Sequence, residues 1–427
     1  MKVAIVIDIF HDKGNGTSMS ARHLVENLVE RGIDVKVLCD NAGQQNETMQ
    51  GVEFVTFPIQ QVPIYQKVIE QQHAWLASPN DARIREALKD VDLVHIYMPF
   101  ALGTHCARIA HELGIPVLGC YHVSAENITF NAKMKYVPGA TPAMYQLLKV
   151  YHYKPEWINN IHCPSRCIAS TLMGHLYNQN LHVISNGYDP AFKRIDDVKI
   201  PEGCEDKIVV TSVGRLTEEK RQDLIIKAVA KSKYRDRISL FLAGKGPKQE
   251  EYEKLAKELN VDLHIVFLSQ QELVNLLNAS YIFVQASDVK TESIACLEAI
   301  ACGTVPIISN AKMCATKQFA LTPQSMFRKG SAYSLATMMD FWISNKKTHD
   351  EMMPKYSEFA QKFSLDKCIN YMLELYEFLL NDDKKKYVVK DYNNPMTFTL
   401  DRDQLGLISP KHNQFRLLAK QKRFMSK

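Results

Sequence analysis

The chain has 427 residues, which is enough for two domains of ordinary size. Its 46% hydrophobic and 23% charged residues are typical of a globular protein and exclude a disordered or membrane-embedded chain. The net charge of +5 is too small to argue for nucleic acid as a partner, and no apolar run reaches the roughly 18–20 residues that span a bilayer.

The first residues, "MKVAIVIDIF", predict a β-strand rather than a signal peptide, because no small-residue cleavage site follows them. Ten cysteines are scattered along the chain, and many lie inside apolar patterns, which favours reduced thiols and a cytoplasmic protein. Cys163 and Cys167 form a CxxxC without a second Cys/His pair at ligand spacing, so no metal site is expected there.

The first half alternates apolar strands with helices. Strands are expected at 2–10, 34–39, 92–99, 116–122, 160–165 and 181–187, with a helix at about 19–31 after the first strand. Strands without polar alternation, separated by helices, indicate a parallel sheet covered on both faces.

The pattern restarts after the polar, proline-bearing stretch 191–206. Strands are expected at 207–216, 238–247, 263–268, 281–288 and 305–309, and helices at about 219–233, 248–259, 271–279, 331–345, 350–363 and 367–380. The sequence therefore predicts an α/β protein with two doubly wound domains, 1–190 and 207–365, a linker at 191–206 and a closing segment, 366–427. The closing segment is expected to contain a helix that returns toward the first domain, followed by a basic tail. A ligand cleft is expected at the carboxyl ends of the strands of the two domains.

Three groups of residues in the second domain could bind an anionic, hydroxylated ligand. Gly214 and Arg215 end one strand, and Lys220 follows at the start of a helix. The two cations and the backbone N–H groups of the helix could bind a phosphate. The alternative is that both cations are solvated surface charges. Gly244 and Gly246 permit close backbone approach or form a plain turn, and the absence of GxGxxG argues against a dinucleotide fingerprint. Glu292 and Glu298 flank the start of a short apolar helix, and a carboxylate can accept hydrogen bonds from vicinal hydroxyls.

The first domain contributes candidates at two strand ends. Gly14 and Gly16 lie between the first strand and helix, where the backbone could approach a substrate. His122 ends the strand "LGCYH", although a histidine at such a place is more often an ordinary hydrogen-bonded residue.

The stretches "VGRLTEEKRQDLIIKA", "LAGKGP", "ISNGYD" and "CLEAIACGTVPIIS" resemble those of the retaining family-4 glycosyltransferases of GT-B fold, over about residues 1–380. The resemblance implies a UDP-sugar donor and no metal or other cofactor. It assigns the diphosphate to Arg215 and Lys220 and the ribose to Glu298. The remaining donor contacts that it implies are Gly14, Gly16, Gly214, Gly244, Gly246, Glu292, Ser293 and Ile294, and His122 would lie near the reacting sugar.

One departure from the family pattern concerns the first glutamate. The family spaces its two glutamates by seven residues, a count that falls on Lys290 here, whereas Glu292 is two residues nearer to Glu298. Aligning Glu292 with the family's first glutamate places a two-residue gap in the following loop. The alternative is that Lys290 replaces the glutamate.

The acceptor is expected on the first domain. Residues 129–157 interleave aromatic side chains with lysines, and the tail 411–427 has six Lys/Arg and no acid, which suits an anionic membrane surface on the inner face of the cell membrane. A solvated basic face over an ordinary core would show the same composition. The resemblance favours transfer of glucose or galactose to diacylglycerol or ceramide. The alternatives are polysaccharide or polyprenyl-linked glycan assembly, a non-catalytic GT-B adaptor, and a sugar-nucleotide epimerase.

Overall fold

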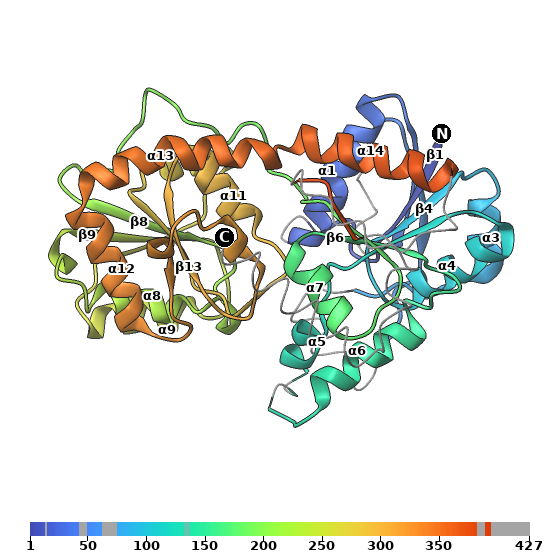
Figure 1. Cartoon of the computed structure of the whole chain (residues 1–427), viewed down its shortest axis with the longest axis horizontal. Coiled ribbons are helices and arrows are strands. Elements are labelled where there is room, and N and C mark those ends of the chain that lie inside the picture. The colour runs from blue at the N-terminus through green and yellow to red at the C-terminus, as the bar shows by residue number, and fades with distance from the viewer. Residues whose placement is uncertain are drawn as a thin grey trace, which may run out of the picture. The chain divides into compact units, whose positions relative to one another are not determined.

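The computed structural model describes residues 1–12, 15–41, 49–61, 75–132, 134, 136–381 and 389–393. The chain divides into two compact units (Figure 1). Unit 1 comprises residues 1–184 together with the described residues from Ile369, and unit 2 comprises Ser185–Cys368. All ten cysteines are free thiols.

Unit 1 is built on an eight-stranded parallel sheet in the order β16-β7-β6-β5-β4-β1-β2-β3. Its strands are β1 (Lys2–Val6), β2 (Asp34–Asp40), β3 (Val52–Phe57), β4 (Leu93–Ile96), β5 (Val117–Cys120), β6 (Asn160–Cys163), β7 (Asn180–Val183) and β16 (Val389–Asp391). Its helices are α1 (Gly16–Glu30), α3 (Asp81–Leu88), α4 (Ala101–Leu113), α5 (Ala125–Asn131), α6 (Ala140–Tyr151) and α7 (Arg166–Gly174). The chain order reverses between β1 and β4, so this is where a doubly wound sheet offers a ligand crevice.

Unit 2 has a six-stranded parallel sheet in the order β10-β9-β8-β11-β13-β15 and a two-stranded sheet, β12-β14. Its strands are β8 (Ile208–Val213), β9 (Ile238–Ala243), β10 (Leu263–Val266), β11 (Ile282–Gln285), β12 (Val289–Lys290), β13 (Val305–Ser309), β14 (Met313–Cys314) and β15 (Met326–Phe327). Its α-helices are α8 (Gln222–Val229), α9 (Gln249–Glu258), α10 (Gln270–Ala279), α11 (Ile294–Ala301), α12 (Ala332–Ser344) and α13 (Lys346–Ala360). Its 3₁₀ helices are η1 (Glu218–Lys220), η2 (Arg235–Arg237), η3 (Ala315–Phe319), η4 (Pro323–Ser325) and η5 (Gln361–Phe363).

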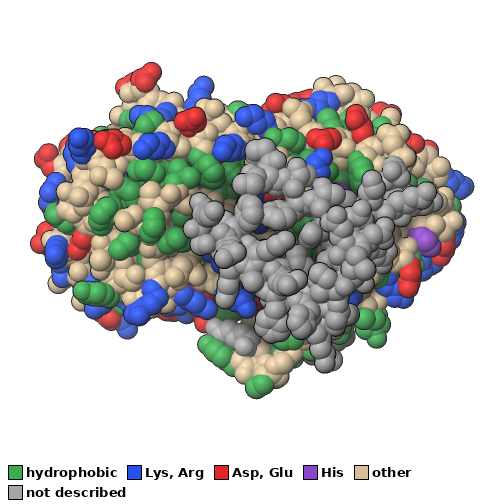
Figure 2. All heavy atoms as spheres, in the orientation of Figure 1, with side chains coloured by type: hydrophobic (Ala, Val, Ile, Leu, Met, Phe, Trp, Pro, Cys, Tyr) green, Lys and Arg blue, Asp and Glu red, His purple; other side chains and the backbone are tan. Residues whose placement is uncertain are grey.

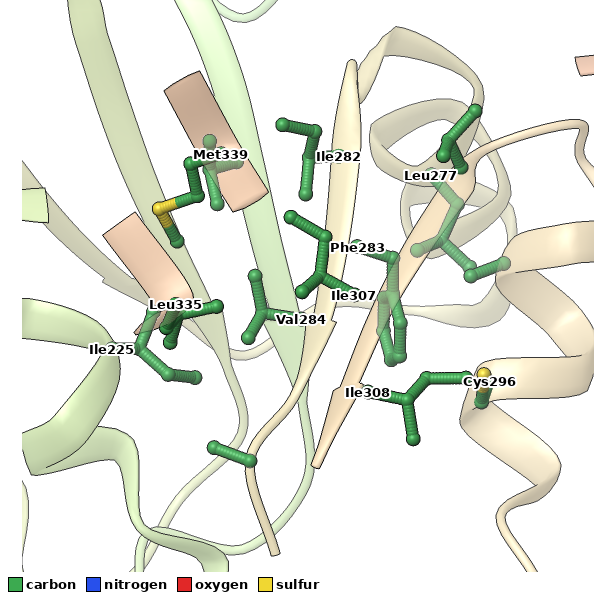
Figure 3. Packing of buried hydrophobic residues seen from close by; sticks show 14 of the residues in the cluster. Ile225, Leu277, Ile282, Phe283, Val284, Cys296, Ile307, Ile308, Leu335 and Met339 are labelled. Atoms are coloured by element: carbon green, nitrogen blue, oxygen red, sulfur yellow. The ribbon is translucent and has the colours of Figure 1, made fainter. Parts of the chain in front are cut away.

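The core of unit 2 shows why its strands carry no polar alternation. Ile282 and Val284 of β11 and Ile307 of β13 are fully buried, and helices cover both faces of the sheet. In Figure 3, Ile225, Leu335 and Met339 pack on one side of these strands, and Leu277 and Cys296 pack on the other. Burying an aliphatic side chain of this size stabilises the fold by about 1.5–3 kcal/mol, so apolar residues on both faces favour a central parallel strand.

The chain passes from one unit to the other after Ile184 and again after Cys368. The stretch 191–206 belongs to unit 2, where the backbone N–H of Ile195 and of Lys199 donate to the side chains of Asn278 and Asn275 on α10. Helix α14 (Leu365–Asn381) begins in unit 2, and from Ile369 onward it belongs to unit 1, where the hydroxyl of Tyr376 lies 2.7 Å from Nδ1 of His95. Residues 411–427, the predicted basic tail, lie outside the described part of the chain.

Many of the expected elements agree with the observed ones, although α8 is shorter than expected by three and four residues at its two ends, α13 begins four residues early and ends three residues early, and β3 was not expected. The two parallel α/β sheets confirm the predicted fold class, and helices α9, α10, α12 and α14 lie within one or two residues of their expected bounds. No helix among the described residues is both long and apolar enough to cross a bilayer.

Candidate functional site

The candidate donor site of unit 2 lies where the chain order of its sheet reverses. Strand β8 is flanked by β9 on one side and β11 on the other, and all three are parallel. Their carboxyl ends therefore place three loops next to one another: the loop 214–221 after β8, the loop 244–248 after β9 and the segment 286–293 after β11. This is the position at which doubly wound sheets bind ligands.

The first two loops pack backbone against backbone, and the glycines make this possible. The N–H of Leu216 donates to the carbonyl of Lys245 at 2.9 Å. A Cβ on Gly244 would lie 2.1 Å from the carbonyl oxygen of Gly214, and one on Gly246 would lie 2.3 Å from that of Leu216. The predicted close approach of these two glycines is therefore to the neighbouring loop. Gly214 differs, because its φ of +147° favours glycine and open space lies where its Cβ would be.

Two of the predicted cations lie on the loop after β8. Arg215 is exposed, and its carbonyl accepts a hydrogen bond from the buried Gln222, which fixes the backbone beneath the guanidinium. Lys220 ends η1 and is half-buried. The next residue, Arg221, has a left-handed φ of +58° and pairs with Asp223 of α8 and with Asp288 after β11. That pairing connects the loop with Lys220 to the segment with Glu292.

The N-terminus of α11 supplies backbone N–H groups to the same place. Its first turn holds no acidic residue, and no side chain caps it. The hydroxyl of Ser293, the N-cap residue, donates to Oε1 of Gln285 at 2.9 Å. The N–H groups of the first helical turn have no partner within the helix and favour an anion. Ser293 and Ile294 therefore stand at a suitable place for a phosphate contact. The first turn of α8, in contrast, contains Asp223.

The two glutamates have different surroundings. Glu298, on α11, is partly exposed, and burial together with the nearby carboxylate of Asp189 raises its pKa to about 8. Glu292 is only 5% exposed, and its Oε2 accepts hydrogen bonds from both the backbone N–H and the side-chain amide of Asn186, at 3.0 and 2.7 Å. Lys290 ends β12, so only residues 291–293 separate it from α11. The alignment of Glu292 with the family's first glutamate stays a prediction.

The predicted residues of unit 1 lie at the carboxyl ends of two strands of its sheet. His122 follows β5, is buried, and stacks on Tyr97 with ring centroids 5.0 Å apart. Burial, with a smaller effect of His162, holds the pKa of His122 well below its usual value, so the imidazole is neutral. Its Nε2 has no hydrogen-bond partner within the described part of the chain. Gly16 begins α1, and Gly14 lies outside the described residues.

Three side chains of unit 2 that support this site were not singled out from the sequence: Asn186, Asp189 and Gln285. The first two stand in "ISNGYD", whose polar residues were a sequence signal, but only the fold places them beside Glu292 and Glu298. Gln285 is an amide inside an apolar strand, a type of residue that is rarely buried without a partner.

Comparisons with known proteins identify the family of this chain. The family model for glycosyltransferase family 4 matches residues 14–192, and that for the group 1 glycosyl transferases matches residues 194–362. Two curated relatives align with most of the chain. The alpha-monoglucosyldiacylglycerol synthase of Streptococcus pneumoniae is 24% identical over 324 residues, 73% of this chain and 71% of that protein. The GDP-mannose-dependent alpha-mannosyltransferase of Corynebacterium glutamicum is 25% identical over 375 residues, 82% of this chain and 83% of that protein.

A solved structure shows the same fold. Anabaena HepE, determined in complex with UDP and glucose, covers 88% of this chain and 99% of its own, with a TM-score of 0.68 and 15% sequence identity. The arrangement of its elements supports the architecture of two parallel-sheet domains. The chain therefore belongs to the family-4 glycosyltransferases of GT-B fold, and it is a hexosyltransferase.

Proposed function

We propose that the protein transfers glucose or galactose from a UDP-hexose to a membrane lipid such as diacylglycerol or ceramide, with retention of the α-configuration. The observation that carries the donor half of this proposal is the convergence of three loops at the switch point of unit 2. The loop after β8 contributes the two cations and Gly214, which has open space where a Cβ would lie. The N-terminus of α11, which no side chain caps, follows the neighbouring strand β11. This combination suits a diphosphate.

The reaction requires the protein to bind, orient and stabilise charge. Arg215, Lys220 and the N–H groups at the start of α11 would stabilise the negative charge that develops on the departing diphosphate. Glu298 would accept hydrogen bonds from the ribose hydroxyls, and Glu292 from the hydroxyls of the hexose. The neutral imidazole of His122 would contact the transferred sugar by hydrogen bonding rather than as a cation. In this proposal Arg215 and Lys220 supply the positive charge at the diphosphate.

The lipid half of the proposal rests on the exposed face of α6. Leu147, Val150 and Tyr151 are 46%, 54% and 61% exposed, and Ala143 continues the same stripe one turn earlier. A helix on a protein surface normally shows polar residues on its outer side. We call Ala143, Leu147, Val150 and Tyr151 the α6 face. Hydrophobic side chains gather at the end of unit 1 where Figure 1 places α5 and α6 (Figure 2).

The segment before α6 has the same character. Tyr136 is 83% exposed and the neighbouring Val137 is also exposed, and the sequence places Lys133 and Lys135 beside them. An apolar face next to basic residues is typical of an element that lies on an anionic bilayer. The name of the Streptococcus relative, a glucosyldiacylglycerol synthase, also favours a lipid acceptor.

The diphosphate assignment can be tested by calorimetric titration with UDP and with uridine. We expect Arg215→Ala and Lys220→Ala each to weaken UDP binding about tenfold or more, since a hydrogen bond to a charged group contributes about 1.5–3 kcal/mol. Uridine, which has no phosphate, should bind equally to both variants and the wild type. Lys245→Ala is the matched control, because Lys245 lies on the adjacent loop with its ammonium 4.0 Å from the ring centroid of Phe267.

Unchanged UDP affinity in both variants would remove the phosphate role. The second curated relative is named for GDP-mannose, so GDP and GDP-mannose are titrated beside UDP. Tighter binding of the guanine nucleotides would contradict the proposed donor.

A further inference from the structure

The carboxylate of Glu292 is held by a residue that lies 106 positions earlier in the chain. Asn186 directs two donors at one oxygen, Oε2: its backbone N–H at 3.0 Å and its side-chain amide at 2.7 Å. Glu292 is almost completely buried, and a buried carboxylate requires such hydrogen bonds. Two donors that converge on one oxygen fix the direction in which the carboxylate points.

Asn186 is itself fixed by its neighbours. The N–H of Gly187 donates to the hydroxyl oxygen of Ser185, and Gly187 lies so close to the start of α14 that a Cβ would be 2.7 Å from Cα of Leu365. The backbone of Tyr188 makes two hydrogen bonds: its N–H donates to the carbonyl of Phe363, and its carbonyl accepts from the N–H of Leu365. This segment begins unit 2 where the chain leaves unit 1, so Glu292 is tied to a rigid part of the backbone.

The segment that carries Glu292 is also held from its other side. The hydroxyl of Ser293 donates to Oε1 of Gln285, and the amide of Gln285 donates to Ser287 at 2.7 Å. All three residues are buried. Buried polar networks of this kind, when satisfied, restrict side chains to one arrangement. The short connection between β12 and α11 therefore presents Glu292 in a single orientation.

We propose that Asn186 is a positioning residue that orients Glu292 toward the hydroxyl groups of the donor hexose and so contributes to hexose selectivity. The proposal rests on the proposed function, in which Glu292 contacts that sugar. A carboxylate has about four acceptor positions, and both donors of Asn186 are directed at the same oxygen of Glu292. The ligand class that this arrangement recognises is a neutral hexose with adjacent hydroxyl groups.

The test compares the affinities of the full chain for UDP, UDP-glucose and UDP-galactose by calorimetry. We expect Asn186→Ala to lower affinity for the preferred UDP-hexose about tenfold or more while UDP affinity stays unchanged, because small displacements of a positioning group can cost as much as about a hundredfold. The ratio of the two hexose affinities should move toward one. Glu292→Gln should have the same pattern, and the double variant should be no weaker than Glu292→Gln alone.

Asn275→Ala is the matched control. The side-chain amide of Asn275 also makes two hydrogen bonds to a segment distant in sequence: its oxygen accepts from the backbone N–H of Lys199, and its nitrogen donates to the carbonyl of Lys199. Neither glutamate takes part in these hydrogen bonds. This variant should bind all three ligands as the wild type does. If Asn186→Ala does not fold, Asn186→Ser is used instead. The serine side chain is polar but shorter than that of asparagine, so its hydroxyl replaces the amide as the donor.

Two results would overturn the proposal while leaving the proposed function intact. The first is that the Asn186 variant binds UDP-hexose with wild-type affinity, whereas Glu292→Gln binds it more weakly than the wild type. The other is a double variant whose losses multiply, which would mean that Asn186 acts independently of Glu292. A wild-type protein that binds neither UDP nor UDP-hexose would overturn the proposed function, and this proposal with it.

Discussion

At the scale of single residues, the two glutamates show how much surroundings alter the same side chain. Both could be singled out from the sequence because they flank the start of an apolar helix. The difference between their surroundings could not be predicted from the sequence. Glu292 is hydrogen-bonded to Asn186 and Glu298 lies beside Asp189, and these two partners are far from the glutamates along the chain. The sequence therefore identifies the acidic groups, whereas their ionisation and orientation depend on contacts that only the fold creates.

The raised pKa of Glu298 leads to a prediction about proton release. Burial and Asp189 shift its pKa from 4.5 to about 8, so at pH 7 most unliganded molecules carry this carboxyl protonated. Ribose hydroxyls that donate to Glu298 favour the ionised form. We expect UDP binding to release a proton between pH 7 and 8 and to tighten as the pH rises through 8. Calorimetry in two buffers of different ionisation enthalpy measures the released proton.

The control for this prediction is Glu298→Gln, which should bind UDP without the additional proton release. Equal proton release in the variant and the wild type would contradict the ribose role. The same shift has a consequence for stability. The folded state binds this proton more tightly than the unfolded chain, so stability falls as the pH rises from 4.5 through 8. Glu298→Gln should flatten that part of the thermal unfolding profile.

At the scale of elements, composition alone could not separate core residues from surface residues in the segment 129–157. Tyr145 and Tyr153 are buried, and their hydroxyls donate to Glu126 and to the carbonyl of Cys120. Lys149 donates to the carbonyl of Leu176. Part of the aromatic and basic pattern is therefore structural, and the exposed apolar residues of α6 were found only from the fold.

The α6 face carries a prediction about membrane binding. We expect the triple variant Leu147→Ser, Val150→Ser, Tyr151→Ser to lose most of its co-sedimentation with anionic vesicles, because burial of each large apolar side chain in the bilayer interface contributes to binding. Its UDP affinity should be unchanged, since that site lies in unit 2. Tyr333→Ser is the matched control, because Tyr333 is a comparably exposed aromatic residue on α12. Co-sedimentation of the triple variant at the wild-type level would rule out this face as the contact.

At the scale of the whole molecule, the two sheets were predictable because apolar strands without alternation recur between helices in each half. Strand order and the division of the chain were less accessible. The boundaries of the units, after Ile184 and after Cys368, depend on contacts between segments about 180 positions apart, such as Gly187 against Leu365. The polar stretch 191–206 has the composition of a linker, yet its backbone is hydrogen-bonded to α10.

The central claim, transfer of a hexose from UDP to a membrane lipid, is tested most directly by identifying the product. The protein is incubated with UDP-glucose or UDP-galactose and with vesicles that contain diacylglycerol or ceramide. Mass spectrometry detects a new hexosyl lipid, and NMR of its anomeric proton gives the configuration. We predict an α-hexosyl lipid from one of the two UDP-hexoses. A β-linked product, or a lipid product formed from GDP-mannose and from neither UDP-hexose, would contradict the account.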